Sequence, residues 1–264
     1  MGAVVKSIHV YPVKSCRGYE LNEAAVLDRG LEHDRSWLLV SKSGLALTQR
    51  DFPRMALIAA QMLDDVTLKL SAAGVQDLLV KRRLHGDEST VQVWNDACAG
   101  VDQGDEVAGW FSSYLSTECR LVSMPEQFVR AVDPKYATGE QQVGFADGFP
   151  FLILSQESLD DLNSKLEYPV PMNRFRPNIV VEGCEPFAED GWRKIRINGI
   201  EFDVVKPCAR CVIVTIDQDD AVTGKEPLRT LSAYRQVGQK VMFGQNLVHH
   251  SRGRIRVGDL IEPV

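Results

Sequence analysis

Two closely spaced cysteines carry the sharpest chemical signal in this sequence. The segment KPCARC (206–211) separates Cys208 and Cys211 by two residues. We expect it to form a turn, because β-forming residues flank it on both sides: EFDVV (201–205) before and VIVTI (212–216) after. Thiols at such a turn could bind a soft metal ion, carry out dithiol redox chemistry, or pack as half-buried side chains.

The spacing of the other residues weakens two of these alternatives. A structural zinc site needs four ligands, yet the sequence has no second Cys-x-x-Cys pair and none of its five histidines lies near the motif with finger-like spacing. A thioredoxin-like dithiol should open a helix, whereas the residues after Cys211 favour a strand. Taken alone, the spacing leaves simple packing open as the remaining interpretation.

The elements that must position these thiols differ between the two halves of the chain. In the first half, β-branched and aromatic runs predict strands at 4–13, 36–40, 57–62, 66–70 and 91–94, and apolar spacing predicts a helix at 105–115. The segment 124–147 is polar and broken by proline and glycine, which is typical of a long connector. We therefore expect a lobe boundary near residue 122.

Short strands dominate the second half. A strand at 149–154 is followed by a helix, capped by Ser155 or Ser158, that runs to about residue 166. Further strands are predicted at 178–182, 194–198, 201–205, 212–216 and 254–261, as in an antiparallel barrel. The predicted fold is α+β and mainly β, with a smaller mixed α/β N-terminal lobe (1–122) and a β-barrel lobe (123–264).

Composition excludes several classes of function. The 36 acidic and 30 basic residues give a net charge of -6, which argues against a general nucleic-acid binder and requires any anion site to be local. No apolar run approaches the ~20 residues of a membrane span, and the first residues lack a signal-peptide core. We expect a cytoplasmic protein whose six cysteines are reduced and which binds neither nucleic acid nor membrane.

Several long segments resemble the MOSC domain and the β-barrel domain that precedes it. The MOSC-like segments are KPCARCVIVTIDQDDAVTGKEPLRTLSAYR (206–235), FGQN (243–246), IRVGDLIEP (255–263), FADGFPFLILSQESLDDLNSKL (145–166) and NRFRPNIVVEGCEPFAEDGW (173–192). In the first half, YPVKSCRG (11–18), RGLEHDRSWLLV (29–40) and TQRDFPRMALI (48–58) resemble the N-terminal domain. The chain is similar to amidoxime-reducing components and to bacterial molybdoenzymes that detoxify N-hydroxylated bases.

This resemblance implies a molybdenum cofactor and a set of residues that hold it. Cys211 would be the metal ligand, for which a soft thiolate is suited, and Cys208 would be structural. The pterin part of the cofactor would be bound by Lys14, Ser15, Arg35, Arg176, Asn178 and Arg210. Asp147 would lie near the metal and supply protons. We expect His249 and His250 to lie in an exposed loop and to have no such role.

The same resemblance implies a reductase that removes oxygen from N-hydroxylated compounds such as hydroxylamines, amidoximes and N-hydroxylated nucleobases. Because no flavin or iron-sulfur motif is visible in the sequence, electrons should come from a separate flavoprotein or iron-sulfur reductase. Two other functions remain open. The chain could carry the molybdenum cofactor without turnover, or it could transfer sulfur through a persulfide on Cys211.

Overall fold

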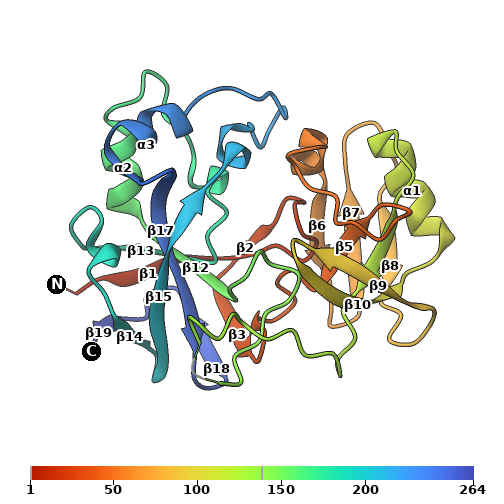
Figure 1. The fold of residues 1–264 in the computed structure, drawn as a ribbon, viewed down its shortest axis with the longest axis horizontal. Helices are drawn as coiled ribbons and strands as arrows, with labels where there is room; N and C mark the ends of the chain where they lie inside the picture. The colour runs from red at the N-terminus through yellow and green to blue at the C-terminus, as the bar shows by residue number, and fades with distance from the viewer. Residues whose placement is uncertain (1, 138) are drawn as a thin grey trace.

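The computed structural model describes residues 2–137 and 139–264, which form two lobes side by side (Figure 1). The large lobe is built on a nine-stranded sheet in which, among the described strands, only β12 and β13 pair in parallel. Its order is β19 (Ile261–Pro263), β14 (Lys194–Ile197), β15 (Ile200–Arg210), β17 (Lys240–His249), β12 (Phe151–Ser155), β13 (Ile179–Glu182), β1 (Val4–Val10) and β2 (Tyr19–Leu21), with β16 (Gln236–Val237) paired to β17.

The first strands of the chain belong to this large lobe. Strand β1 pairs with β13, and a separate small sheet joins β18 (Gly253–Arg256) to β3 (Glu23–Leu27) and β4 (Gly30–Leu31). Both ends of the chain therefore lie at the large lobe (Figure 1). A hydrophobic core fills it, with Ile8, Phe151 and Phe202 at or near complete burial.

Helices of the large lobe are short. They comprise α2 (Gln156–Asn163), α3 (Leu228–Tyr234) and the 3-10 turns η2 (Met172–Arg174), η3 (Ala188–Asp190) and η4 (Val212–Thr215). Ser155 caps α2, since its side chain accepts a hydrogen bond from the Ser158 amide. Across the described parts of the chain, no helix combines the length and apolarity needed to cross a membrane.

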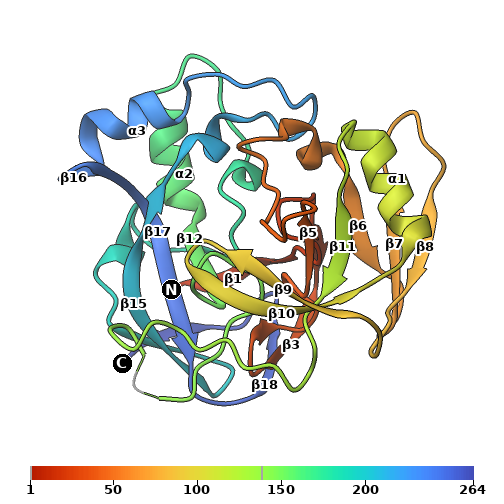
Figure 2. The same cartoon turned by 45° about the vertical axis from the view of Figure 1, so that its right-hand side comes forward.

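The small lobe packs two sheets and one helix around its own core. One sheet has the order β5 (Trp37–Val40), β11 (Arg120–Ser123), β10 (Asp96–Asp102) and β9 (Glu88–Val93); the other has β6 (Ala59–Met62), β7 (Thr67–Ser71) and β8 (Leu78–Lys81), preceded by η1 (Pro53–Leu57). Helix α1 (Asp105–Leu115) buries Val107, Phe111 and Leu115 at helical spacing. The β9–β10 hairpin extends from this lobe towards the large lobe (Figure 2).

The predicted fold class is confirmed, because strands dominate both lobes. Helix α1 has the predicted bounds, and Ser155 is one of the two predicted caps of α2, which ends at Asn163 rather than near residue 166. No helix or strand interrupts the predicted connector among its described residues, where a single bridge joins Ala131 to Gln142.

Two predictions around the cysteine motif are wrong. The motif is not a turn, because β15 continues through Cys208 to Arg210, and residues 212–215 form the 3-10 turn η4 instead of a strand. The last β15–β17 pair joins Arg210 to Val241. Among the described residues no strand pairs with 212–216, of which only Ile216 forms an isolated bridge, with Thr223, and β-branched residues favour a strand only where a sheet can pair with them.

Two predictions near the C-terminus are also wrong. The single strand expected at 254–261 is divided between β18 and β19, which join different sheets and are separated by a turn with Gly258 at a φ of 92°. His249 does not lie in an exposed loop. It ends β17 with 6% of its surface exposed and packs against Phe151 and Phe202, whose rings exclude water from it.

Candidate active site

A cavity of about 1000 Å³ lies where the two lobes meet. Its volume is at the upper end of the range for small-molecule pockets. Among the described residues that line it, nine are lysine or arginine and three are aspartate, although the chain as a whole carries a net charge of -6. The net negative charge means that any anion site has to be local, and this cavity has the local excess of cationic side chains that such a site needs.

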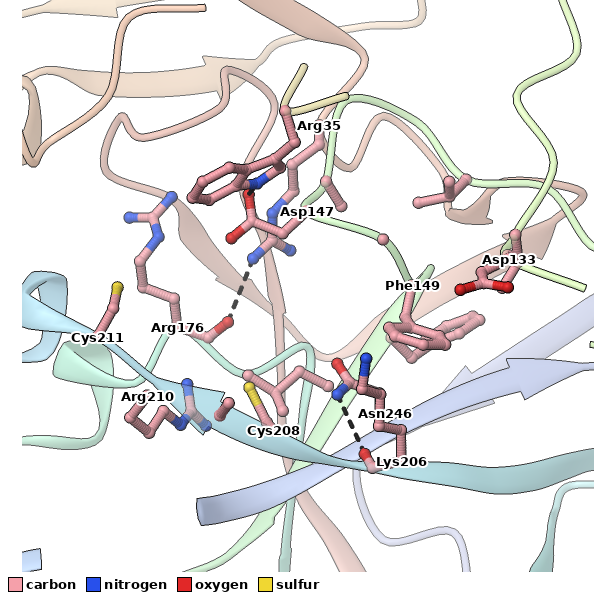
Figure 3. Close-up of a pocket in the computed structure, with 18 of the residues that line it drawn as sticks. Arg35, Asp133, Asp147, Phe149, Arg176, Lys206, Cys208, Arg210, Cys211 and Asn246 are labelled. Carbon is pink, nitrogen blue, oxygen red and sulfur yellow. Dashed lines mark hydrogen bonds between the residues drawn. The ribbon is translucent and has the colours of Figure 1, made fainter. Parts of the chain in front are cut away.

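Strand β15 brings the cysteine motif to the cavity. Successive side chains on a strand alternate between its faces, so Lys206, Cys208 and Arg210 share one side. Two bulges against β17 interrupt the register beside these residues, and bulges next to functional sites redirect side chains. Both Cys208 and Cys211 point into the cavity (Figure 3).

The two thiols have different surroundings. Cys211 accepts a hydrogen bond at Sγ from Arg50 Nη2, which comes from the small lobe, at 3.4 Å. Burial raises the pKa of the Cys208 thiol, which keeps it protonated. Neither forms a disulfide. Cys211 is therefore the better placed of the two to act as a thiolate ligand.

Arg210 is fixed beside the thiols with one donor unused. Its Nε donates to the carbonyl of Phe243 at 2.7 Å, and its Nη1 donates to the carbonyl of Phe175 at 2.9 Å. Nη2 is buried and has no hydrogen-bond partner among the residues that the structure describes. A Cβ at Gly244 would lie 3.2 Å from Nη2, so this glycine makes room for the guanidinium. An acceptor brought by a ligand would satisfy Nη2.

Two more guanidinium groups share one aromatic ring. The Cζ atoms of Arg35 and Arg176 lie 4.2 Å and 4.3 Å from the centroid of Tyr11. Asp34 and the carbonyl of Arg176 hold Arg35 in place, the latter through Nη2 at 3.2 Å (Figure 3). Burial and the neighbouring Arg35 lower the pKa of Arg176 to about 10. A bound anion would relieve this repulsion.

Lys14 and Asp147 form an ion pair in the cavity wall. The Lys14 side chain is 8% exposed and that of Asp147 is 62% exposed, since the carboxylate faces the cavity. Burial lowers the pKa of Lys14, against the attraction of Asp147. Desolvation would raise the pKa of Asp147, but Lys14 and further donors hold it well below its ordinary value. Asp147 is therefore ionised at neutral pH, and the proton of the pair resides on Lys14.

Ser15 and Asn178 complete the predicted set. Both side-chain polar atoms of Asn178 bond to main chain, Oδ1 accepting from Leu152 at 3.2 Å and Nδ2 donating to His9 at 3.3 Å. Asn178 thereby fastens β1 to β12 behind the cavity. The carbonyl of Ser15 accepts from Gln49 at 2.7 Å. The structure brings all the predicted site residues together in the lining: Lys14, Ser15, Arg35, Asp147, Arg176, Asn178, Arg210 and Cys211.

Sequence reasoning missed several residues of the cavity, above all Arg50 and Trp94. Arg50 lies in the TQRD segment, to which we assigned no role. Trp94 was expected to end a strand, but it opens the two-residue loop of the β9–β10 hairpin. A large aromatic residue at a tight turn, before the turn-forming Asn95, is the signal that could have singled it out.

Comparison with known proteins agrees with the resemblance. The MOSC N-terminal beta barrel domain matches residues 2–118, and the MOSC domain matches residues 140–262. The chain is 38% identical to mitochondrial amidoxime-reducing component 1 of Mus musculus and of Homo sapiens, over 97% of this chain and 80% and 81% of those proteins. It is 32% identical to the molybdenum cofactor sulfurase of Danio rerio, over 93% of this chain and 32% of that protein.

Both matched regions contribute residues to the cavity, Lys14 and Arg35 from the first and Arg176 and Cys211 from the second. Because it is 38% identical to these proteins over 97% of its own length and about four fifths of theirs, the chain belongs to the MOSC-domain family that includes the amidoxime-reducing components.

Proposed function

We propose that this protein is a molybdenum-cofactor-dependent reductase that removes oxygen from N-hydroxylated compounds. The observation that carries the proposal is the cavity between the lobes. It combines a cysteine thiol, a cationic wall and a buried arginine donor that has no hydrogen-bond partner in the part of the chain that the structure describes. The names of the amidoxime-reducing relatives support this reaction class, and that of the cofactor sulfurase supports the cofactor.

The residues of the cavity fit such a cofactor. Cys211 offers the soft sulfur ligand that molybdenum accepts. The anionic pterin would be held by four cationic side chains, those of Lys14, Arg35, Arg176 and Arg210. Arg210 Nη2, which has no partner among the described residues, would donate a hydrogen bond to it. Ser15 would add a hydroxyl. Asn178 would keep the strands behind them in place. When bound, the cofactor supplies the two-electron redox chemistry that amino-acid side chains lack.

The protein's own groups would handle protons and position the substrate. Conversion of an N-hydroxyl group to an N–H group and water consumes two electrons and two protons. The lowered pKa of Lys14 makes its ammonium a better acid than a free lysine, and the adjacent Asp147 carboxylate, which stays ionised, would hold that ammonium at the cavity wall as the proton source. The Asp147 carboxylate, which faces the cavity, can also accept hydrogen bonds from substrate N–H groups.

Electrons would reach the site from a separate flavoprotein or iron-sulfur reductase. We place the reaction in the cytoplasm, an assignment that the six free cysteines support.

The proposal is tested by measuring molybdenum per chain in wild type, Cys211→Ala and Cys208→Ala, all produced in a host that makes the cofactor. We expect near-stoichiometric metal in wild type and in Cys208→Ala, and little in Cys211→Ala. Wild type should also reduce benzamidoxime when coupled to an electron-donating reductase.

Other results would point elsewhere. Metal that depends on Cys211 without reduction of any N-hydroxylated compound would favour a cofactor carrier. Sulfane sulfur on Cys211 in a metal-free protein would favour sulfur transfer. Equal metal contents in all three proteins would overturn the assignment of Cys211.

A further inference from the structure

Trp94 adopts a backbone conformation that large residues avoid. Its φ is 56°, in the left-handed region, where a bulky side chain is strained. Nine non-glycine residues in the described parts of the chain have positive φ, and four of them line the cavity: Ser15, Arg35, Trp94 and Arg176. Three of the four belong to the predicted binding set. Such strain persists only where the surrounding structure imposes it, and strained residues cluster at functional sites. The fourth residue, Trp94, is therefore a candidate site residue as well.

The Trp94 side chain links the small lobe to the centre of the cavity. The residue is 54% exposed, and its Nε1 donates to Asp147 Oδ1 at 3.0 Å. The Cζ atom of Arg50 lies 4.5 Å from the indole centroid, and Arg50 Nη2 donates to Cys211 Sγ at 3.4 Å. The indole thus presents one face to a planar group that reaches the Cys211 thiol, while its edge bonds to Asp147.

The group on this face has the shape of an amidine. The guanidinium of Arg50 is flat and delocalised, and its N–C–N unit carries N–H donors. An amidoxime and the amidinium formed by its reduction share that planar unit. Arg50 therefore occupies a place that such a group would fit, between an aromatic face and the sulfur of Cys211. Arg50 is held there by the Trp94 face, by the charge of Asp147 and by a hydrogen bond to sulfur, a weak acceptor. The first two contacts are also open to a planar amidine, and the arginine stem is flexible, so such a group can take the place of the guanidinium.

We propose that Trp94 and Arg50 select substrates by shape, an inference that rests on the proposed function and deepens it. Planar conjugated N-hydroxylated groups stack on the Trp94 indole in the place of the Arg50 guanidinium, which swings aside. The Asp147 carboxylate, held by the indole N–H, accepts hydrogen bonds from the amidine nitrogens. N-hydroxylated amines with a tetrahedral nitrogen gain little from this face.

Two variants distinguish the contribution of the Trp94 ring from the effect of its unusual backbone conformation. Trp94→Phe keeps an aromatic face and removes the Nε1 donor. Trp94→Asn removes the ring, and asparagine tolerates the left-handed conformation. Tyr168→Asn is the matched control, because Tyr168 is 76% exposed and lies outside the cavity. Each cofactor-loaded protein is assayed with benzamidoxime, which is planar, and with N-hydroxycyclohexylamine, which is not.

We expect Trp94→Asn to lower the benzamidoxime to N-hydroxycyclohexylamine ratio of kcat/KM by about 5- to 30-fold, mainly through KM, the effect of losing one strong stacking interaction. Trp94→Phe should keep most of the ratio, and the control should not change it. Benzamidine, the planar amidine product, should bind about 5- to 30-fold more weakly to Trp94→Asn by isothermal titration calorimetry, a measurement that needs no turnover.

Failure of this inference can be distinguished from failure of the proposed function. If Trp94→Asn retains molybdenum, the wild-type ratio and the wild-type affinity for benzamidine, the role of Trp94 is overturned while the reductase stands. A wild type that binds benzamidine through Trp94 but reduces neither substrate would instead overturn the reductase. A wild type that reduces benzamidoxime yet binds no benzamidine at millimolar concentration also counts against the inference.

Discussion

Replacing Arg210 by lysine would keep the positive charge in the cavity and remove its fixed geometry. The native guanidinium spends two donor groups on the carbonyls of Phe175 and Phe243 and leaves Nη2 unpartnered among the described residues. A lysine ammonium is a single compact group. It must satisfy those carbonyls with the same protons that a cofactor would require.

The size of the effect follows from this division of donors. A hydrogen bond from a charged group contributes about 1.5–3 kcal/mol. Loss of the Nη2 bond to a cofactor should therefore weaken cofactor affinity by about 10- to 100-fold. In the cofactor-free protein only a carbonyl contact is lost, so the free energy of unfolding should fall by only about 1–2 kcal/mol.

The assay is molybdenum retained per chain during prolonged dialysis, with urea unfolding of the cofactor-free protein measured in parallel. Arg235→Lys is the matched control: Arg235 Nε donates to the Met242 carbonyl at 3.1 Å, and the side chain pairs with Asp190 outside the cavity lining. Retention in Arg210→Lys equal to wild type would refute the assignment of Nη2. So would equal losses in the two variants.

Three further predictions concern the wall opposite Arg210. The pKa of Asp147 is lowered from 3.8, so its ionised form stabilises the folded chain above that pH, and this contribution is lost as the pH falls below it. The difference in urea stability between wild type and Asp147→Asn should therefore be constant above about pH 5 and shrink as the pH falls from about 5 to about 3; a difference that stays constant throughout would contradict the ion pair. The pKa of Lys14 is also lowered, so the unfolded chain binds its proton more tightly and the charged form costs stability at neutral pH. Lys14→Met removes this cost, and Asp147 is not left as a buried unpaired charge because water can reach its carboxylate. The unfolding free energy of the cofactor-free variant should therefore rise by about 1–2 kcal/mol, while the variant produced with the cofactor should contain less molybdenum than wild type. A lower unfolding midpoint would show that the pair is stabilising. Trp94→Gly should be more stable than Trp94→Val by about 1–2 kcal/mol, because both lack the indole and only valine is strained at positive φ; equal thermal midpoints would remove the argument from strain.

Local patterns predicted the elements whose stability is local. Helix α1 has the expected bounds because its buried residues repeat at helical spacing and its first turn is acidic. Residues 212–216 have the composition of a strand, but the β15–β17 pairing ends at Arg210, and among the described residues only Ile216 then forms an isolated bridge, with Thr223, which no local pattern reveals. Pairing of β1 with β13 joins segments about 170 residues apart and is equally invisible locally.

The candidate site divides in a similar way. Family resemblance pointed to Lys14, Arg35, Arg176 and Cys211, and the structure brings all four into one lining. The sequence did not identify Trp94 as a cavity residue, because its position in the cavity depends on where the β9–β10 hairpin ends, and this depends on how the two lobes pack together.

The path of the chain has a consequence for when the site can form. Strands β5 to β11 of the small lobe are contiguous in sequence, so this lobe can complete its sheets early in synthesis. Strands β1 and β3 emerge before the small lobe but cannot pair until β13 and β18 are made, and such long loops close slowly. The cavity therefore exists only once β17 has emerged from the ribosome and paired with β15, and loading of any cofactor is an event that follows closure of the large lobe beside a finished small lobe.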